Sequence, residues 1–295
     1  MQCLIVNTIG DNNVFNGMIM TGINDDAIIR AIFQIRSEFT CDIGNKPISI
    51  TGTGFFIRND IETFLFITNR HNLDPTLKLG VDTTYKLSRI SFCLRKQLDG
   101  MFSSETKWIS LKRCDCIKNS MSADISAIYN FELAESGNIN EYQPSPFLFS
   151  ELADKDYITR NVSMMDVASF VGFPGMKVGW WDQEGNLPIA RTVNIASYPK
   201  KSFSNPSIKT SDVILVSGLS FSGSSGSPIL LHQKGIVING SHNIEIKNDS
   251  YVPPKIIGIM SGHWWDENCE PVMFRHSGLS YFTKSSAIHD LICAL

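Results

Sequence analysis

The amino-acid sequence predicts an all-β protein made of two antiparallel β units, and three observations lead to this prediction. Short runs rich in β-branched and aromatic residues recur along most of the chain, separated by turns rich in Gly, Pro, Asn and Ser. Few segments carry the periodicity of an amphipathic helix. The 295 residues fit one large β domain or two of about 130 residues each, and a hydrophobic content of 43% is enough for complete cores.

The predicted strands fall into two sets of similar size, joined by a segment rich in Asn, Ser, Gly and Pro at residues 135–146 that we interpret as a linker. The first set is expected at Ile29–Ile35, Ile48–Ile57, Thr63–Thr68, Tyr85–Leu94, Lys107–Leu111 and Ile125–Asn130. The second set is expected at Val167–Gly172, Arg191–Ser197, Asp212–Ser217, Ser227–Leu231, Ile256–Ser261 and Leu279–Phe282. Many short strands with such turns predict closed or sandwiched antiparallel sheets.

The two ends of the chain differ from this pattern. Residues 1–28 precede the first predicted strand and are expected to form an N-terminal extension, which either contacts a partner or adds a strand at a sheet edge. A short terminal helix is expected from Ser285 to Ala294, with Ser285 or Ser286 as its N-cap. Its apolar residues with helical spacing are Ile288, Leu291, Ile292 and Leu295.

The segment Gly223–Pro228, which reads Gly-Ser-Ser-Gly-Ser-Pro, is the most informative motif. Glycines permit unusual backbone angles, so a serine between them can stand clear of the backbone. Acyl transfer from such a serine also needs N–H groups aimed at the oxygen that becomes negative, and Gly223 and Ser225 are placed to supply them. An ordinary Ser/Gly turn is the alternative interpretation of this segment taken alone.

A histidine and an aspartate with suitable surroundings precede the motif. His71 follows the apolar run 63–68, so we expect it on a loop held by a buried strand. Asp124 opens another short apolar strand, where its poorly solvated carboxylate would seek a buried donor such as an imidazole N–H. The separations, 124 − 71 = 53 and 225 − 124 = 101 residues, leave room for several strands, so the three residues can meet in a cleft.

Together these segments resemble the three catalytic motifs of the trypsin/chymotrypsin-like serine peptidases, most closely those of the bacterial and viral branches. The three are Ile67–His71, Ala123–Ile128 and Gly223–Pro228. Other segments resemble the strand before the histidine, a turn early in the second barrel and the strand after the serine loop of those proteins. These are Gly52–Ile57, Val171–Gly175 and Ile257–Gly262. The resemblance covers the chain from about Ala31 to its C-terminus.

The resemblance implies a chymotrypsin-like fold of two six-stranded antiparallel β-barrels with a short C-terminal helix. The first barrel would comprise residues 29–146 and carry His71 and Asp124. The second barrel would comprise residues 147–283 and carry Ser225, and the helix would comprise residues 284–295.

The activity implied is that of a serine endopeptidase. Ser225 would be the nucleophile, His71 its base and then the acid for the leaving amine, and Asp124 would hold the imidazole tautomer. The backbone N–H groups of Gly223 and Ser225 would form the oxyanion hole. Ser224 is a rival nucleophile in the variable position of the family pattern Gly-x-Ser-Gly, and Asp115 rivals Asp124 but lies between two cysteines without a following strand.

The resemblance also places a specificity pocket beside the nucleophile. Its expected substrate-binding residues are Leu219, Ser220, Met260, Ser261, Gly262 and His263. Leu219 stands where members that cut after basic residues carry a carboxylate, and Met260 replaces the histidine of acid-specific bacterial members. A charged substrate side chain would therefore enter without a partner, which is costly. We expect an apolar or small uncharged residue before the scissile bond.

Composition limits the partners. A net charge of −3 with scattered basic residues gives no phosphate-binding face, so no nucleic acid is expected. No stretch approaches the ~20 apolar residues of a membrane span, so no membrane is expected either. The expected partners are a protein or peptide substrate and, as a further candidate, a regulatory protein.

The cysteines indicate a cytoplasmic protein. Their number, seven, is odd and their spacing forms no disulfide framework, so we expect free thiols. The N-terminus has no basic region typical of a secretory signal. Asn72 stands where secreted animal members of the family carry a cysteine. Cys114 and Cys116 are separated by one residue, unlike common zinc ligands, so neither a metal nor another cofactor is expected.

Ser224 also bears on regulation, because animal members carry at this position an aspartate that pairs with a freed N-terminus. That switch is absent here, and we expect a preformed oxyanion hole, with a partner-induced one as the alternative. A catalytically silent or partner-activated protein-binding module is the alternative function. An esterase would use the same triad, although the Gly-x-Ser-x-Gly setting of α/β-hydrolases is not matched.

Overall fold

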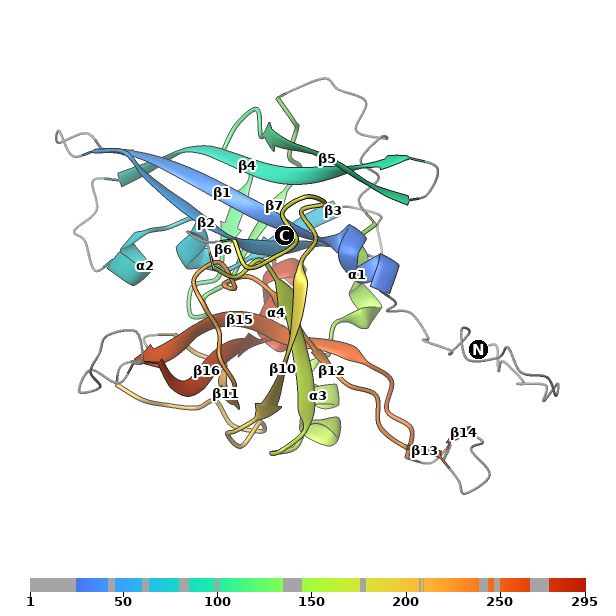
Figure 1. Ribbon diagram of the computed structural model, residues 1–295. Coiled ribbons are helices and arrows are strands. Elements are labelled where there is room, and N and C mark those ends of the chain that lie inside the picture. The colour runs from blue at the N-terminus through green and yellow to red at the C-terminus, as the bar shows by residue number, and fades with distance from the viewer. Residues whose placement is uncertain are drawn as a thin grey trace.

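The computed structural model describes residues 25–41, 46–59, 64–79, 85–98, 101–134, 145–175, 179–206, 208, 210–238, 244–246, 250–265 and 276–295. Two β units account for most of these residues, with the N-terminal sheet above and the C-terminal barrel below in Figure 1. Most of the expected N-terminal extension and most of the expected linker lie outside the described residues. The all-β fold class predicted from the sequence is confirmed.

The N-terminal unit is an eight-stranded sheet rather than the expected six-stranded barrel. Its strands are β1 (Ile32–Cys41), β2 (Ile48–Arg58), β3 (Phe64–Thr68), β4 (Tyr85–Leu98), β5 (Met101–Ser110), β6 (Ile117–Asn119), β7 (Ser126–Tyr129) and β8 (Phe147–Leu148). Seven follow the order β5-β4-β1-β2-β3-β7-β6, and β8 pairs in parallel with β2. The two additional strands, β6 and β8, have three and two residues, too few for a periodic sequence pattern.

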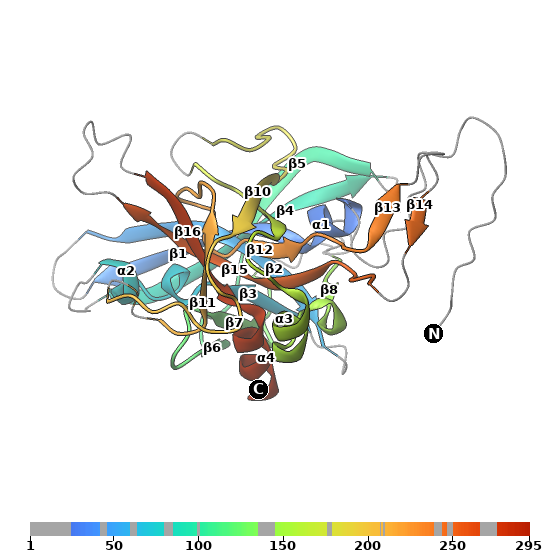
Figure 2. The same cartoon turned by 90° about the horizontal axis from the view of Figure 1, so that it is seen from below.

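The C-terminal unit has the expected six strands, which close into a barrel in the order β10-β11-β16-β15-β12-β9. They are β9 (Val167–Gly172), β10 (Ile189–Ile195), β11 (Val213–Ser217), β12 (Pro228–Leu231), β15 (Lys255–Trp265) and β16 (His276–Lys284). A separate hairpin, β13 (Ile236–Ile238) and β14 (Ile244–Ile246), projects from this barrel in Figures 1 and 2.

Helices are short. They are α1 (Asp25–Ala31), α2 (Thr76–Leu79), α3 (Lys155–Asn161) and α4 (Ser285–Cys293), with 3₁₀ turns η2 (Arg70–Asn72) and η4 (Phe149–Glu151). The expected strand at Ile29 is wrong for its first residues, because α1 continues to Ala31. Helix α4 confirms the expected terminal helix, but its N-cap is Lys284. The Ser285 hydroxyl instead donates to the carbonyl of Ala153 at 2.5 Å.

Three apolar cores hold the molecule together, and the strands between them are buried on both faces. In β3, Leu65 and Ile67 point into a core shared with the C-terminal barrel, whereas Phe66 points into the core of the N-terminal sheet. Burial on both faces explains why consecutive residues of β3 are apolar in the sequence. Helix α4 adds Ile288 and Leu291 to the shared core, so it joins the two units (Figure 2).

The cysteines within the described residues are thiols: Cys41, Cys93, Cys114, Cys116 and Cys293. Burial raises the pKa of Cys114 and of Cys116, and both pack against the core of the N-terminal sheet. In the described part of the chain, no helix has the length and apolar character needed to cross a membrane.

Candidate active site

His71 lies in the 3₁₀ turn η2, directly after the buried strand β3, and only 3% of it is exposed. The turn is fixed at both ends. The Leu73 N–H donates to the Arg70 carbonyl at 2.9 Å, and the Arg70 guanidinium pairs with Asp74 at 3.2 Å. The core therefore sets the position of β3, and β3 sets the position of the imidazole.

Asp124 approaches His71 from the segment that precedes β7. Its Oδ2 lies 2.7 Å from His71 Nδ1, and its Oδ1 accepts the His71 backbone N–H at 3.0 Å. Because a carboxylate only accepts, Nδ1 carries a proton, and in the neutral imidazole the lone pair then lies on Nε2. Asp115 makes no such contact, since it is an exposed residue paired with Arg113 at 3.0 Å.

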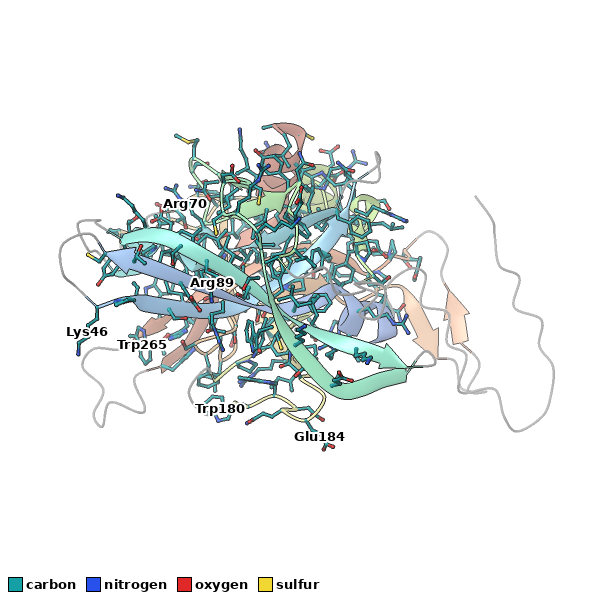
Figure 3. The ribbon with its side chains drawn as sticks, turned by 90° about the horizontal axis from the view of Figure 1, so that it is seen from above. Lys46, Arg70, Arg89, Trp180, Glu184 and Trp265 are labelled. Carbon is teal, nitrogen blue, oxygen red and sulfur yellow. The ribbon has the colours of Figure 1, made fainter. Side chains whose placement is uncertain are left out.

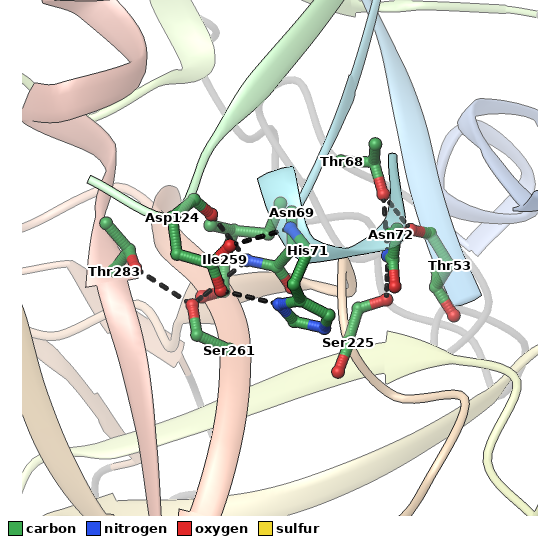
Figure 4. A network of polar contacts seen from close by, with 10 residues as sticks. All are labelled: Thr53, Thr68, Asn69, His71, Asn72, Asp124, Ser225, Ile259, Ser261 and Thr283. Atoms are coloured by element: carbon green, nitrogen blue, oxygen red, sulfur yellow. Dashed lines mark hydrogen bonds and ion pairs between the residues drawn. The ribbon is translucent and has the colours of Figure 1, made fainter. Parts of the chain in front are cut away.

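A second set of hydrogen bonds ties this pair to the C-terminal barrel. Asn69 Nδ2 donates to the Asp124 carbonyl at 2.8 Å and to Ser261 Oγ at 3.0 Å. Ser261 lies in β15 and is bonded in turn to Thr283 Oγ1 of β16 at 2.8 Å. All of these side chains are buried or nearly so. The network (Figure 4) thus spans both units and fixes the Asp124 side of the imidazole.

Ser225 lies in the loop between β11 and β12 of the C-terminal barrel. Its side chain stands beside the His71 ring, on the side opposite Asp124 (Figure 4). Ser225 is half-buried, whereas its rival Ser224 is 1% exposed. The Ser224 hydroxyl lies 3.4 Å from the Phe221 N–H, inside the turn. Of the two serines, Ser225 is therefore the one presented to the histidine.

Hydrogen bonds hold each carbonyl of the serine loop from residue 222 to residue 225. The carbonyl of Ser222 accepts from Gly175 N–H at 2.8 Å, that of Gly223 from Thr53 Oγ1 at 2.8 Å, and that of Ser224 from Ser227 N–H at 3.0 Å. The carbonyl of Ser225 accepts from Thr53 N–H at 2.8 Å. Because a trans peptide directs its N–H opposite to its C=O, the Gly223 N–H points away from Gly175.

Two glycines are required in this loop. Gly223 has φ 98° and Gly226 has φ 97°, a conformation that L side chains rarely adopt. At Gly226 a Cβ would also lie 1.7 Å from the Thr53 carbonyl oxygen. The Gly-x-Ser-Gly pattern therefore has a steric basis: the loop turns sharply and packs directly on β2.

Thr53 of β2 connects this loop to the rest of the site, and it is fully buried. Its hydroxyl donates to the Gly223 carbonyl and accepts from the Phe173 N–H at 3.1 Å. Its carbonyl accepts from Thr68 Oγ1 at 2.7 Å. One side chain therefore sets the relative position of β2, the serine loop and the end of β9.

Replacing Thr53 by valine is expected to slow the reaction of Ser225 with a fluorophosphonate about ten- to hundredfold. Valine keeps the shape but leaves the Gly223 carbonyl and the Phe173 N–H without this partner, at about 1–3 kcal/mol each. The loop would then shift relative to His71, and misplaced oxyanion donors slow acyl transfer. Labelling rates measured well below the unfolding temperature test this. The control is Thr40→Val at an exposed position of β1, and equal rates for both variants would contradict the role of Thr53.

Asn72 makes a similar connection between the histidine turn and the serine loop. Its Nδ2 donates to Thr68 Oγ1 at 2.9 Å and to the Ser225 carbonyl at 3.1 Å. The amide fills the space above Gly52, where a Cβ would come within 2.4 Å of Nδ2. A hydrogen-bonded amide thus ties the histidine turn to the serine loop.

The residues expected to wall a specificity pocket divide into two groups. Ser220 and His263 lie together, with Ser220 Oγ 3.4 Å from His263 Nδ1. Leu219, which precedes Ser220 in the chain, is exposed. Met260 and Ser261 do not fit the expectation as pocket walls. Met260 is 1% exposed and belongs to the barrel core, and Ser261 is engaged in the network beside Asp124.

The structure adds His276 of β16 to this region, a residue whose polar surroundings in the sequence do not mark it as part of a site. Its ring stacks on that of His263 with centroids 4.7 Å apart, and its Nδ1 accepts the Gly278 N–H at 2.9 Å. Burial lowers the pKa of His276 below its ordinary value. Of the remaining pocket residues, Gly262 permits close packing, since a Cβ there would lie 2.6 Å from the Tyr281 hydroxyl.

The described residues contain no cluster of three or more His, Cys, Asp or Glu side chains able to hold a metal ion. The site presents a hydroxyl, an imidazole and a carboxylate. This set is the one required for nucleophilic catalysis: an activatable hydroxyl, a base and a group that orients the base.

Comparisons with known proteins give a likeness of fold only. No protein-family model and no curated protein matches the sequence. Among solved structures, the chain is similar to the Rv3671c protease from M. tuberculosis in its active form, with 12% identity over 98% of this chain and 93% of that chain and a TM-score of 0.48. It is also similar to Deg5, with 12% identity over 89% of this chain and 87% of that chain and a TM-score of 0.44.

The site lies where two β units meet, one carrying the histidine and the aspartate and the other the serine loop.

Proposed function

We propose that this protein is a serine endopeptidase that cleaves peptide bonds through an acyl-enzyme on Ser225. The observation that carries the proposal is the pairing of His71 Nδ1 with Asp124 at 2.7 Å, with the Ser225 side chain on the opposite side of the ring (Figure 4). Asp124 fixes the tautomer, so Nε2 can accept the Ser225 proton as the hydroxyl attacks a carbonyl.

The steps follow from these positions. Ser225 Oγ forms a bond to the carbonyl carbon while its proton passes to His71 Nε2, and the imidazolium is stabilised by Asp124. His71 then gives this proton to the leaving amine, the C–N bond breaks, and the acyl-enzyme remains. A water molecule then attacks the acyl carbon while its proton passes to His71. The ester C–O bond breaks, the acid product leaves, and His71 returns the proton to Ser225 Oγ.

The oxyanion would be held by the N–H groups of Gly223 and Ser225. The orientation of the loop supports this, because the Ser222 carbonyl is bonded to Gly175 and the Gly223 carbonyl to Thr53. Both carbonyls are thereby kept from turning toward the oxyanion, and the Gly223 N–H is available on the other face of its peptide. We therefore infer a preformed hole that needs no activating partner.

The purified protein alone is expected to react with a serine-directed fluorophosphonate and to hydrolyse peptides that carry an apolar or small uncharged residue before the scissile bond. A preformed hole requires no reorganisation, whereas loss of one oxyanion donor costs about 10²–10³ in turnover. Labelling and turnover with and without added cell extract measure this. Labelling that requires the extract would instead support the partner-activated binding module.

A further inference from the structure

A cavity of about 340 Å³ lies between the N-terminal sheet and the residues Phe173, Trp181, Gln183 and Asn186 of the C-terminal unit. This volume is at the lower end of the range of ~300–1,000 Å³ found for ligand pockets. Strands β1, β2, β4 and β5 form one wall, and the other includes Phe173, Trp181 and Asn186. The proposed mechanism assigns no task to this cavity.

The cavity begins close to the serine loop. Thr51, one of its lining residues, precedes Thr53 by two residues in β2, a distance of about 6.6 Å along a strand. Phe173, on the opposite wall, donates its N–H to the Thr53 hydroxyl that holds Gly223. The cavity therefore begins about two residues along β2 from the place where Thr53 contacts the serine loop.

The cavity is positively charged. The Arg36 guanidinium lines it and lies 4.2 Å from the centre of the Trp108 ring, which holds it in place. Arg95 lies behind the wall at 2% exposure and donates to the Asn186 carbonyl. Burial lowers the pKa of Arg95 to about 10, so it remains a cation at neutral pH. The neighbouring Cys93 thiol is neutral, because burial raises its pKa to about 11.

The Arg36 guanidinium has no acidic partner among the described residues. No described aspartate or glutamate lines the cavity, and no described carboxylate forms an ion pair with Arg36. On the neighbouring elements, Glu105 pairs with Lys96 at 3.3 Å, and Asp182 accepts the Gly185 N–H at 2.9 Å. Glu184 lies at the outer end of its loop and points away from the sheet (Figure 3). A half-buried cation without a counter-ion is a costly arrangement.

Asn186 supplies a second, independent observation. It lines the cavity at 4% exposure, and its Nδ2 has no hydrogen-bond partner among the described residues. Buried amide groups nearly always have a partner. An acceptor oxygen within reach of both Asn186 Nδ2 and Arg36 would satisfy the amide and the charge together.

We propose that this cavity is a binding site for a carboxylate, held by the Arg36 guanidinium and Asn186 Nδ2. One source of the carboxylate is an acidic side chain of a bound peptide substrate, and this source rests on the proposed function. The other source is a free small dicarboxylate. Both use the same charge-assisted hydrogen bonds.

Binding is tested with the Ser225→Ala protein, so that no cleavage interferes and the result does not depend on activity. Trp108 and Trp181 line the cavity, and tryptophan fluorescence therefore reports its occupation. One arm compares glutarate with its neutral diamide. The other compares acetylated, amidated alanine hexapeptides that carry a single glutamate or glutamine at each position in turn. We expect at least a tenfold preference for the charged member of a pair, as for a hydrogen bond to a charged group.

Arg36→Gln and Asn186→Asp are each expected to abolish this preference. Aspartate tolerates the left-handed backbone conformation of Asn186 (φ 48°). It also places a negative charge in the cavity, which would repel a carboxylate. Arg89→Gln, at an exposed arginine of β4 (59% side-chain exposure, labelled in Figure 3), is the matched control and should change nothing. Each variant is first checked for cooperative thermal unfolding.

Each outcome decides between the alternatives. Discrimination between glutamate and glutamine peptides assigns the site to the substrate, and a glutarate preference alone assigns it to a free carboxylate. No preference in either arm, or a preference that survives both Arg36→Gln and Asn186→Asp, overturns the proposal. None of these results bears on whether Ser225 is a nucleophile.

Discussion

Ser225→Ala is expected to abolish fluorophosphonate labelling and to lower peptide hydrolysis about 10⁴- to 10⁶-fold. In the proposed mechanism the hydroxyl oxygen of Ser225 forms the acyl bond, and no other group of the loop can replace it. The fold should persist, because hydrogen bonds to four backbone carbonyls and the turns at Gly223 and Gly226 hold the loop. Labelling stoichiometry by mass spectrometry and progress curves with a peptide substrate measure the two effects.

Ser224→Ala is the matched control for this experiment. Ser224 is the neighbouring serine, but it is 1% exposed and its hydroxyl lies against the Phe221 N–H at 3.4 Å. Its loss should lower activity far less than the loss of Ser225 and should leave labelling intact. Labelling that persists in Ser225→Ala and disappears in Ser224→Ala would reverse the assignment of the nucleophile.

Asp124→Asn is expected to lower kcat about 10⁴-fold with little change in the folded structure. Asparagine keeps the shape of Asp124, but its amide presents an N–H group to His71, which already directs its backbone N–H and Nδ1–H at this side chain. The imidazole would then favour the tautomer with its proton on Nε2, which cannot accept a proton from Ser225. Steady-state kinetics at neutral pH give kcat and KM separately, and the loss should fall on kcat.

Asp115→Asn is the control variant, because it removes a carboxylate that makes no contact with His71. Asp115 is 70% exposed and pairs with Arg113 on the surface, an interaction worth about 0–1 kcal/mol. Its replacement should leave kcat and stability nearly unchanged. A loss of activity in Asp115→Asn comparable to that in Asp124→Asn would mean that the site rearranges in solution and that the choice between the two aspartates is wrong.

The sequence by itself was enough to predict the all-β class, the six strands of the C-terminal barrel and the terminal helix. These features are local. Strand β3 is a short run bounded by polar residues, and α4 repeats apolar residues with helical spacing, so each can be recognised from its own segment. The sharp turn of the serine loop could also be predicted from its glycines, because a turn with positive φ requires glycine at fixed positions.

The motifs around His71, Asp124 and Ser225 could be selected in the sequence because they carry reactive groups next to buried strands. The structure brings the histidine and aspartate to 2.7 Å and places the serine beside them. The predicted pocket residues differ from the structure where a residue's role depends on the face of the strand to which its side chain points. Met260 was expected to wall a pocket, yet its register in β15 directs it into the barrel core. A shift of one residue in strand register would turn a side chain from the core to the pocket. The spacing of residues in the sequence does not determine this register.

Contacts between segments far apart in the chain could be recognised only in the tertiary structure. Thr53 lies 170 residues from Gly223, and Asn69 lies 192 residues from Ser261, yet these pairs hold the site together. The cavity beside Arg36 and Asn186 likewise combines two units of the fold. Threonine and asparagine are common in loops and strands, so their local surroundings mark none of them as special. Their roles arise because packing of the apolar cores brings buried donors and acceptors together, and each buried polar group must find a partner.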